Sequence, residues 1–120
     1  VQAHATGTSL GDLAEARALR RSLGSAADHL PVCAPKGQLG HLLGGAGAVE
    51  TILALQALRQ GVMPRSHNAD PLDPEVELAV TNKGHATLAS GQRLLLKNAF
   101  GFGGHNISLV LAGSTPAQPG

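Results

Sequence analysis

The chain has 120 residues, a formal net charge of +1 and 42% hydrophobic residues, which is enough apolar material for one small core. The near-neutral charge, the lack of a basic cluster and an aromatic content of 2% without Trp or Tyr argue against a nucleic-acid-binding surface. A single cysteine excludes an internal disulfide and fits an intracellular protein, and glycines and a glutamate interrupt the longest apolar run, which argues against a membrane span.

The first predicted helix follows residues 1–8, which we expect to be the end of a strand that runs into a loop. Ser9 and Asp12 approximate a capping box, and the acidic residues Asp12 and Glu15 suit the first turn of a helix. Apolar residues then recur at helical spacing, namely Leu13, Ala16, Leu19 and Leu23. Gly24 is a natural stop for this helix.

A short buried strand is predicted at residues 30–34, followed by a glycine turn that separates Lys36 from His41. Residues 42–58 are apolar on every side, which predicts a helix that is buried all round and ends at Gly61. A lysine and a histidine are costly to keep at the mouth of a buried helix. Their presence is the first indication of a functional site.

The second half of the chain is predicted to be mostly irregular, with one hairpin. The expected elements are an extended loop at 63–74, a short strand at 75–80, a polar loop at 81–92, a hairpin of buried strands at 94–98 and 107–112, and a flexible tail at 114–120. The turn of the hairpin is longer and richer in glycine than a simple hairpin needs.

Three stretches resemble motifs of the β-ketoacyl-acyl carrier protein synthases, the condensing enzymes of fatty acid synthesis. They are Val1–Asp12, Lys36–Glu50 and Asn98–Gly104, and they occur in the order and at the separations usual for that family. The resemblance implies an α/β fold, the C-terminal half of a thiolase-like fold in which helices pack on a mixed sheet. Residues 1–113 would form this half, and 114–120 the tail.

The resemblance also implies a reaction: an acyl group moves from carrier protein to a cysteine and is then condensed with malonyl-carrier protein, with release of carbon dioxide. That cysteine lies in the N-terminal half of the family's much longer chains. We therefore interpret this sequence as the C-terminal portion of a larger chain, inactive by itself. Expected partners are the acyl carrier protein, the N-terminal half and a second copy in a homodimer. No dissociable cofactor is expected beyond the carrier's phosphopantetheine, and the expected compartment is the mitochondrial matrix or the bacterial cytoplasm.

By this resemblance the catalytic residues include His4, His41 and Lys36. A lone histidine in a glycine turn is usually structural, but the two imidazoles would together donate N–H groups to the enolate oxygen of the decarboxylated substrate. Lys36 would be buried and paired with Glu15, instead of being an exposed turn lysine. Helix capping remains an open alternative for Asp12 and Glu15.

Two phenylalanines, Phe100 and Phe102, are ordinary core residues on composition alone. The resemblance makes Phe102 the gate at the nucleophile, with its backbone N–H as half of an oxyanion hole, and makes Phe100 a supporting residue. Thr6 and Thr8 match threonines that hydrogen-bond the phosphopantetheine arm. Hydroxyls that satisfy the loop backbone are the competing interpretation for both threonines.

Glu50 is a carboxylate within an apolar helix, so it must be paired or bind a cation. Some relatives bind a monovalent cation with this glutamate and the asparagine that matches Asn106, although Gln2 replaces a common asparagine nearby. Cys33 is rejected as the nucleophile because it lies at a buried strand end, where inert cysteines are common. The nearby Lys36 keeps that rejection from being absolute.

Two alternatives remain. A non-catalytic, chain-length-type partner subunit of a polyketide synthase has the same fold, although retention of both histidines and Lys36 argues against it. A truncated product that folds poorly is the other, because half a sheet leaves an apolar face exposed. His105 stands where the family commonly has threonine, and it either alters the acyl-chain fit or faces away.

Overall fold

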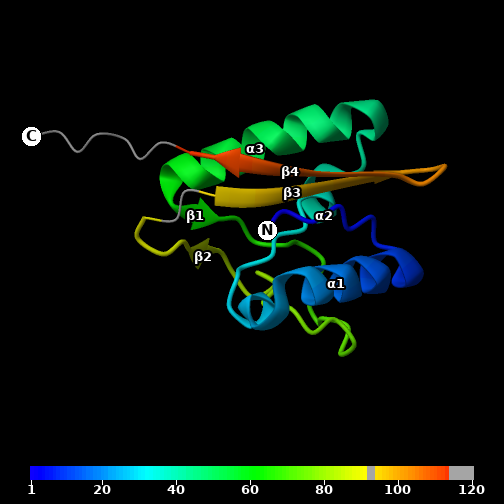
Figure 1. Ribbon diagram of the computed structural model, residues 1–120, viewed down its shortest axis with the longest axis horizontal. Helices are drawn as coiled ribbons and strands as arrows, with labels where there is room; N and C mark the ends of the chain where they lie inside the picture. Colours follow the sequence, from blue (N-terminus) through cyan, green and yellow to red (C-terminus); the bar gives the residue numbers. More distant parts are fainter. Residues whose placement is uncertain (92–93, 114–120) are drawn as a thin grey trace, which may run out of the picture.

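The computed structural model describes residues 1–91 and 94–113, and all structural statements refer to these residues. The elements, in chain order, are α1 (Ser9–Leu23), η1 (Gly24–Asp28), α2 (Lys36–Leu39), η2 (Leu43–Gly45), α3 (Ala46–Gln60), β1 (Val62–Met63), β2 (Ala86–Thr87), β3 (Leu94–Gly101) and β4 (His105–Ala112). The two long helices, α1 and α3, lie on opposite sides of the strands (Figure 1).

The strands combine antiparallel pairs with parallel bridges. β3 and β4 form a hairpin in register from Leu94↔Ala112 to Gly101↔His105, and the short strands β1 and β2 form a second antiparallel pair. Gln2 joins the N-terminal segment by parallel bridges to both Cys33 and Lys97. This arrangement of helices on strands confirms the predicted α/β class.

Helix α1 forms where the sequence predicts it, but its N-cap is Thr8 and not Ser9. The Thr8 hydroxyl accepts a hydrogen bond of 3.3 Å from the backbone N–H of Gly11, which satisfies one of the free donors of the first turn. Gly24 ends the helix with a φ of 56°, a conformation that glycine adopts without strain. The predicted stop is therefore confirmed.

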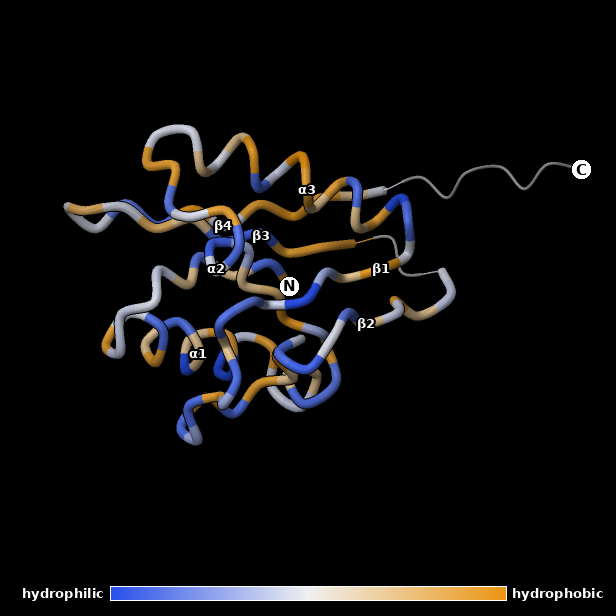
Figure 2. The backbone as a smooth tube through the Cα atoms, turned by 180° about the vertical axis from the view of Figure 1, so that it is seen from behind, coloured by the Kyte–Doolittle hydropathy of each residue, from blue (hydrophilic) through white to orange (hydrophobic). Residues whose placement is uncertain are grey.

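Helix α3 differs from the prediction in its start and its burial. A 3₁₀ turn precedes it, so the α-helix begins at Ala46 and not at residue 42, and it ends at the left-handed Gly61 as expected. Its buried residues lie on one face, whereas Ile52 is 59% exposed and Leu55 is also exposed. The expectation of burial on every side is wrong because only one face of α3 packs on the hairpin, although apolar residues continue around the helix (Figure 2).

The remaining elements are shorter or longer than predicted. Within 30–34 only Val32 and Cys33 form bridges, and the strand expected at 75–80 reduces to a bridge of Val80 with Val32. The polar loop at 81–92 contains β2. The hairpin strands extend through the expected long turn, which shrinks to residues 102–104. The predicted tail at 114–120 lies outside the described residues.

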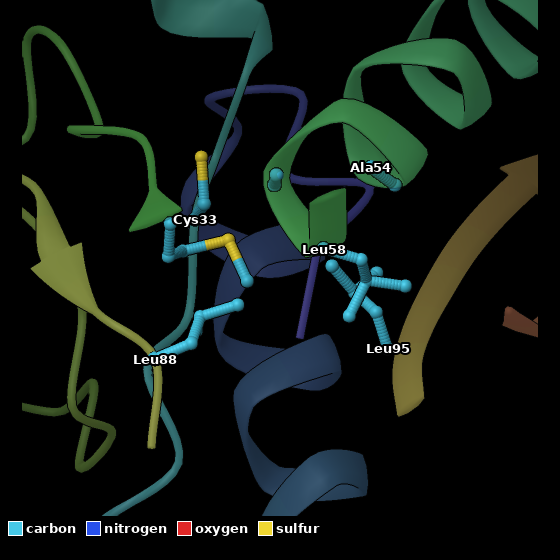
Figure 3. Close-up of a cluster of buried hydrophobic side chains, with 7 residues drawn as sticks. Cys33, Ala54, Leu58, Leu88 and Leu95 are labelled. Carbon is cyan, nitrogen blue, oxygen red and sulfur yellow. The ribbon is translucent and has the colours of Figure 1, made fainter. Parts of the chain in front are cut away.

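Two buried clusters hold these elements together. One lies between α3 and the strands and includes Ala54, Leu58 and Leu95, with Cys33 and Leu88 on its other side (Figure 3). The second is formed by Val1, Ala3, Leu19 and Val32 and joins α1 to the N-terminal segment. Ala5 also packs against this cluster, so the segment that carries His4 is anchored on both sides of the histidine.

Candidate active site

Three segments that are far apart in the sequence meet at His4. The ring centroid of His4 lies 5.7 Å from that of His41, with an angle of 86° between the ring planes. On its other side it lies 5.4 Å from the ring centroid of Phe100 at the end of β3. A pocket of about 680 Å³ opens here, and its lining includes His4, Thr6, Thr8, Asp12, His41, Phe100 and Phe102. The structure thus brings residues of all three sequence motifs to one pocket.

The backbone around His4 is fixed by Glu15. The two carboxylate oxygens of the buried Glu15 accept hydrogen bonds of 2.9 Å from the backbone N–H groups of His4 and Ala5. Ala5 has a φ of 35°, which is strained for a residue with a side chain. Charge-assisted hydrogen bonds of this kind offset such strain and orient the loop. Glu15 therefore positions His4 through its backbone.

Lys36 pairs with Glu50, which corrects the expected pairing with Glu15. The Lys36 Nζ lies 2.7 Å from Glu50 Oε1 and donates a hydrogen bond of 2.6 Å to the backbone carbonyl of His4. Both side chains are buried. The resemblance pointed to Glu15, but the oxygens of Glu15 accept hydrogen bonds from the backbone N–H groups of His4 and Ala5, and Lys36 pairs with Glu50 instead.

Close packing against a loop fixes the turn that carries Lys36. A Cβ atom placed on Gly37 would lie 2.1 Å from the backbone carbonyl oxygen of His67, so only glycine fits this approach. The Asn68 side chain adds a hydrogen bond of 3.0 Å to the carbonyl of Gly37. These contacts hold the lysine turn against the 66–68 loop and so hold Lys36 at the site.

The two histidines differ in their electrostatic settings. Burial and, secondarily, the nearby Lys36 ammonium lower the pKa of His4 below its usual value, which favours a neutral imidazole at neutral pH. His41 is exposed, and its Nδ1 accepts a hydrogen bond of 3.1 Å from the backbone N–H of Leu43. In a neutral His41 the proton is therefore on Nε2, which makes Nε2 the hydrogen-bond donor of a ring that lines the pocket.

Phe102 is not a core residue. It is fully exposed at the tip of the hairpin, and Gly103 and Gly104 follow it with φ values of 81° each. Phe100 is partly buried and contacts His4. The interpretation of both phenylalanines as core, which composition alone favoured, is therefore wrong for Phe102.

Thr8 and Asp12 both accept hydrogen bonds from backbone N–H groups near the start of α1, as their structural interpretations predict. The Thr8 hydroxyl caps α1, and the Asp12 carboxylate accepts a hydrogen bond of 3.2 Å from the backbone N–H of Gly7. Burial raises the pKa of Asp12 above its usual value. Thr6 is exposed and lines the pocket.

The predicted ligands of a monovalent cation, Glu50 and Asn106, do not lie together in the structure. Both carboxylate oxygens of Glu50 contact lysine ammonium groups: Lys36 at Oε1 and Lys97, at 2.6 Å, at Oε2. Asn106 instead lies exposed in β4, opposite Phe100. The alternation of side chains along the hairpin places Asn106 on the face of Phe100 and Asn98, opposite to the face of Lys97, which contacts Glu50.

Sequence reasoning missed Lys97 and Asn98. Lys97 is 1% exposed, and the Asn98 side chain donates a hydrogen bond of 2.9 Å to Glu15 Oε1 and accepts one of 2.8 Å from the Ser108 hydroxyl. The available signal was a lysine placed directly after three leucines in a strand predicted to be buried. A lysine in an apolar strand needs a buried partner for the same reason that Glu50 does in an apolar helix.

Cys33 is unsuited to act as a nucleophile. It is 1% exposed, and burial raises the pKa of its thiol to about 11, so the reactive thiolate is scarce at neutral pH. Across residues 1–91 and 94–113, no three His, Cys, Asp or Glu side chains gather as a metal site would require, and none of the helices has the length and hydropathy of a bilayer-spanning segment.

Comparison with known proteins agrees with the geometry. Residues 1–70 match the family described as beta-ketoacyl synthase, C-terminal domain. The chain is 47% identical over 110 residues to 3-oxoacyl-[acyl-carrier-protein] synthase 2 of Mycobacterium tuberculosis, covering 92% of this chain and 25% of that protein. The proteins of the same name from Mycobacterium leprae and Synechocystis are 45% and 36% identical over similar shares. The chain thus spans about a quarter of the length of these relatives.

Proposed function

The chain belongs to the family of the β-ketoacyl synthase C-terminal domain, and from this premise we propose that it forms part of an elongating 3-oxoacyl-[acyl-carrier-protein] synthase. The proposed reaction is the decarboxylative Claisen condensation of malonyl-carrier protein with an acyl-enzyme thioester. The observation that supports it most is the approach of the His4 and His41 rings to 5.7 Å in a pocket bordered by Phe102. Two imidazoles at this separation can address one thioester oxygen.

The histidines stabilise the enolate. When the malonyl carboxylate leaves as carbon dioxide, the electron pair of the broken C–C bond moves into the thioester, and negative charge gathers on its oxygen. Neutral His4 and the Nε2–H of His41 donate hydrogen bonds to that oxygen. The nucleophilic carbon then attacks the acyl thioester, and the cysteine thiolate leaves. Each donor of this kind contributes about 10²–10³ to the rate.

Lys36 and Glu15 act as positioning residues. The Lys36 ammonium holds the carbonyl of His4 from one side, and the Glu15 carboxylate holds the N–H of His4 from the other. The imidazole is thereby aimed before substrate arrives, so little reorganisation is needed in the transition state. In this proposal neither charged group touches the substrate.

Phe102 serves the acyl-transfer half of the reaction. Its exposed position between glycines lets the backbone approach an acyl-cysteine contributed by the N-terminal half, with the Phe102 N–H as an oxyanion donor. Phe100 supports the His4 ring. Thr6 is the better candidate to bind the pantetheine arm, since the Thr8 hydroxyl already accepts the capping hydrogen bond.

The proposed partners follow from this chemistry. They are an acyl carrier protein, which delivers substrate on its phosphopantetheine, the N-terminal half with the cysteine, and a second copy in a homodimer. No dissociable cofactor is proposed. The relatives are bacterial, which favours the bacterial cytoplasm over the mitochondrial matrix, and their names give no support to the polyketide partner alternative.

The test compares residues 1–120 alone with the same residues joined to an upstream synthase half that contains the cysteine. We expect malonyl-carrier protein decarboxylation and condensation only from the joined chain, measured by carbon dioxide release and 3-oxoacyl product. Robust condensation by residues 1–120 alone would overturn the assignment of the nucleophile to another part of the chain. A joined chain that is fully folded, carries the cysteine and neither decarboxylates nor condenses would overturn the proposed function itself.

A further inference from the structure

Lys97 is a buried charge that the proposed reaction does not use. It lies on β3 with a 1% exposed side chain, and its Nζ donates hydrogen bonds of 2.6 Å to Glu50 Oε2 and 2.7 Å to the carbonyl of Asn98. Lys36 contacts the other oxygen of Glu50. Two ammonium groups therefore surround one carboxylate, and this trio carries a formal excess of one positive charge.

The two lysines do not hold Glu50 in the same way. The Lys36 contact of 2.7 Å is an ion pair outside hydrogen-bond alignment, and Glu50 Oε1 has no hydrogen-bond partner. The Lys97 ammonium makes the aligned hydrogen bond, to Oε2. Glu50 is 0% exposed, and a buried carboxylate needs both charge compensation and hydrogen bonds. Lys97 is therefore the group that fixes Glu50, while Lys36 also serves His4.

The surroundings of the Lys97 ammonium are those of a bound hard cation. Its contacts are a carboxylate oxygen and a backbone carbonyl, the ligand types that such cations prefer. Gln2 is bridged directly to Lys97, so the two side chains stand on the same face of the strands. The Gln2 side-chain oxygen is buried and has no hydrogen-bond partner. A third buried oxygen thus lies on the same face of the strands as the Lys97 side chain and has no hydrogen-bond partner to lose.

We propose that Lys97 is a built-in cation: its ammonium takes the place that a bound monovalent ion would fill beside Glu50, and it positions the Lys36–Glu50 pair beneath His4. The wild-type site accordingly takes no metal ion. Removal of the ammonium leaves a polar cavity lined by the oxygens of Glu50, Asn98 and Gln2, which binds K⁺ or NH₄⁺. Lys97 is thus a positioning residue, and only its effect on catalysis rests on the proposed function.

The test uses the full-length synthase that carries these residues and the variant Lys97→Ser. Both are assayed in KCl, NH₄Cl and choline chloride at equal ionic strength. We expect wild-type rates and melting temperatures to be independent of the cation. The variant loses about 10- to 100-fold in decarboxylation in choline, as is typical when a group that supports a site is removed, and regains most of it in K⁺ or NH₄⁺. Its melting temperature follows the same pattern, which requires no catalysis.

Lys83→Ser is the matched control, because Lys83 forms an exposed ion pair with Asp70. The decarboxylation rate and melting temperature of Lys83→Ser should be the same in KCl, NH₄Cl and choline chloride. A wild-type enzyme that needs K⁺ would overturn the proposal, as would a folded Lys97→Ser variant that is unaffected in choline or equally impaired in every salt. A variant that folds in KCl but not in choline supports it.

If the Lys97→Ser variant does not fold in any of the three salts, wild-type crystals soaked in rubidium chloride test the proposal instead. No anomalous scatterer beside Glu50 supports the proposal, and a bound rubidium ion overturns it. Cation-dependent melting of Lys97→Ser without any condensing activity in either protein would refute the proposed function and leave the built-in cation standing.

Discussion

The buried charged residues near His4 and the exposed apolar residues of η2 and the β3–β4 hairpin reverse the usual distribution between interior and surface. Glu50 and Lys97 are 0% and 1% exposed, whereas Leu43, Val110 and Phe102 are 76%, 68% and 103% exposed. The charged cluster finds its ion-pair partners within this chain. The apolar surface has no partner among the described residues, which is the state expected of a face that contacts another part of a synthase. The charged region can be tested in this chain alone, whereas the apolar region is best tested in the proposed full-length synthase.

The largest expected effect tests whether the charged cluster is a unit. Glu50→Ala leaves the ammonium groups of Lys36 and Lys97 buried without their carboxylate and should lower the free energy of unfolding by about 3–5 kcal/mol. Urea denaturation measures this. Glu75→Ala removes an exposed pair with Arg17 and should cost less than about 1 kcal/mol. An equal loss of the free energy of unfolding in both variants would show that burial does not determine how much these ion pairs contribute to stability.

The second effect concerns the pocket where the two regions meet. In the full-length enzyme, His41→Ala should slow malonyl-carrier protein decarboxylation by about 10²–10³, because the proposed mechanism would lose one hydrogen-bond donor to the enolate. Its melting temperature should hardly change, since His41 is exposed. His85→Ala, at another exposed histidine, should leave the rate unchanged. If His85→Ala slowed the reaction as much as His41→Ala, the effect would not support His41 as a hydrogen-bond donor to the enolate.

A third effect uses pH to probe the buried side. Burial raises the pKa of Cys33 from 9.0 to about 11, so between these values the folded state keeps a proton that the unfolded state loses. The stability contributed by this thiol is present below pH 9 and is lost as the pH rises toward 11, by roughly 2–3 kcal/mol. Denaturation of the wild type and Cys33→Ala across this range measures the difference. A constant difference would contradict burial as the cause.

A smaller shift is expected at low pH. The lowered pKa of His4 means that the unfolded state binds this proton first, so stability falls as the pH drops from 6.5 through the pKa of the folded state. Decarboxylation should also persist to a lower pH than a histidine of ordinary pKa would allow. A pH–rate profile checks this. An acidic limb at or above 6.5 would show that His4 is not shielded from protonation.

The smallest expected change in stability belongs to the hairpin tip. Phe102→Ala should alter the free energy of unfolding by no more than about 0.5 kcal/mol, because the side chain is fully exposed. Acyl transfer to the cysteine of the full-length enzyme should nevertheless slow, as measured by the burst of acyl-enzyme. Phe100→Ala, which removes the ring beside His4, is the contrasting variant and should also impair decarboxylation.

Local patterns in the sequence were sufficient for α1, for the end of α3 and for the hairpin. Helical spacing and Gly24 gave α1, Gly61 gave the end of α3, and the three motifs led to the convergence of His4 with His41. These features depend on backbone preferences within a few residues or on a family resemblance. Both kinds of information can be read directly from the chain.

Partners across the fold could not be predicted in this way. The hydrogen bond between Lys97 and Glu50 joins residues 47 positions apart, and no periodicity reports which carboxylate a lysine will meet. The one-sided burial of α3 also escaped prediction, because an apolar helix has the same pattern whether its second face meets this chain or another. Pairing and burial are properties of the assembled structure.

The tight approach of Gly37 to the carbonyl of His67 constrains how homologous sequences can diverge. Any chiral amino acid at position 37 would force the 66–68 loop to retreat. Ser66 in that loop accepts the backbone N–H of Ala34, two residues before Lys36, so a retreat would also pull on the strand that leads to the lysine. The sequence of a surface loop outside the pocket is therefore constrained by this contact. Substitutions in the 66–68 loop should co-vary with those in the turn that carries Lys36.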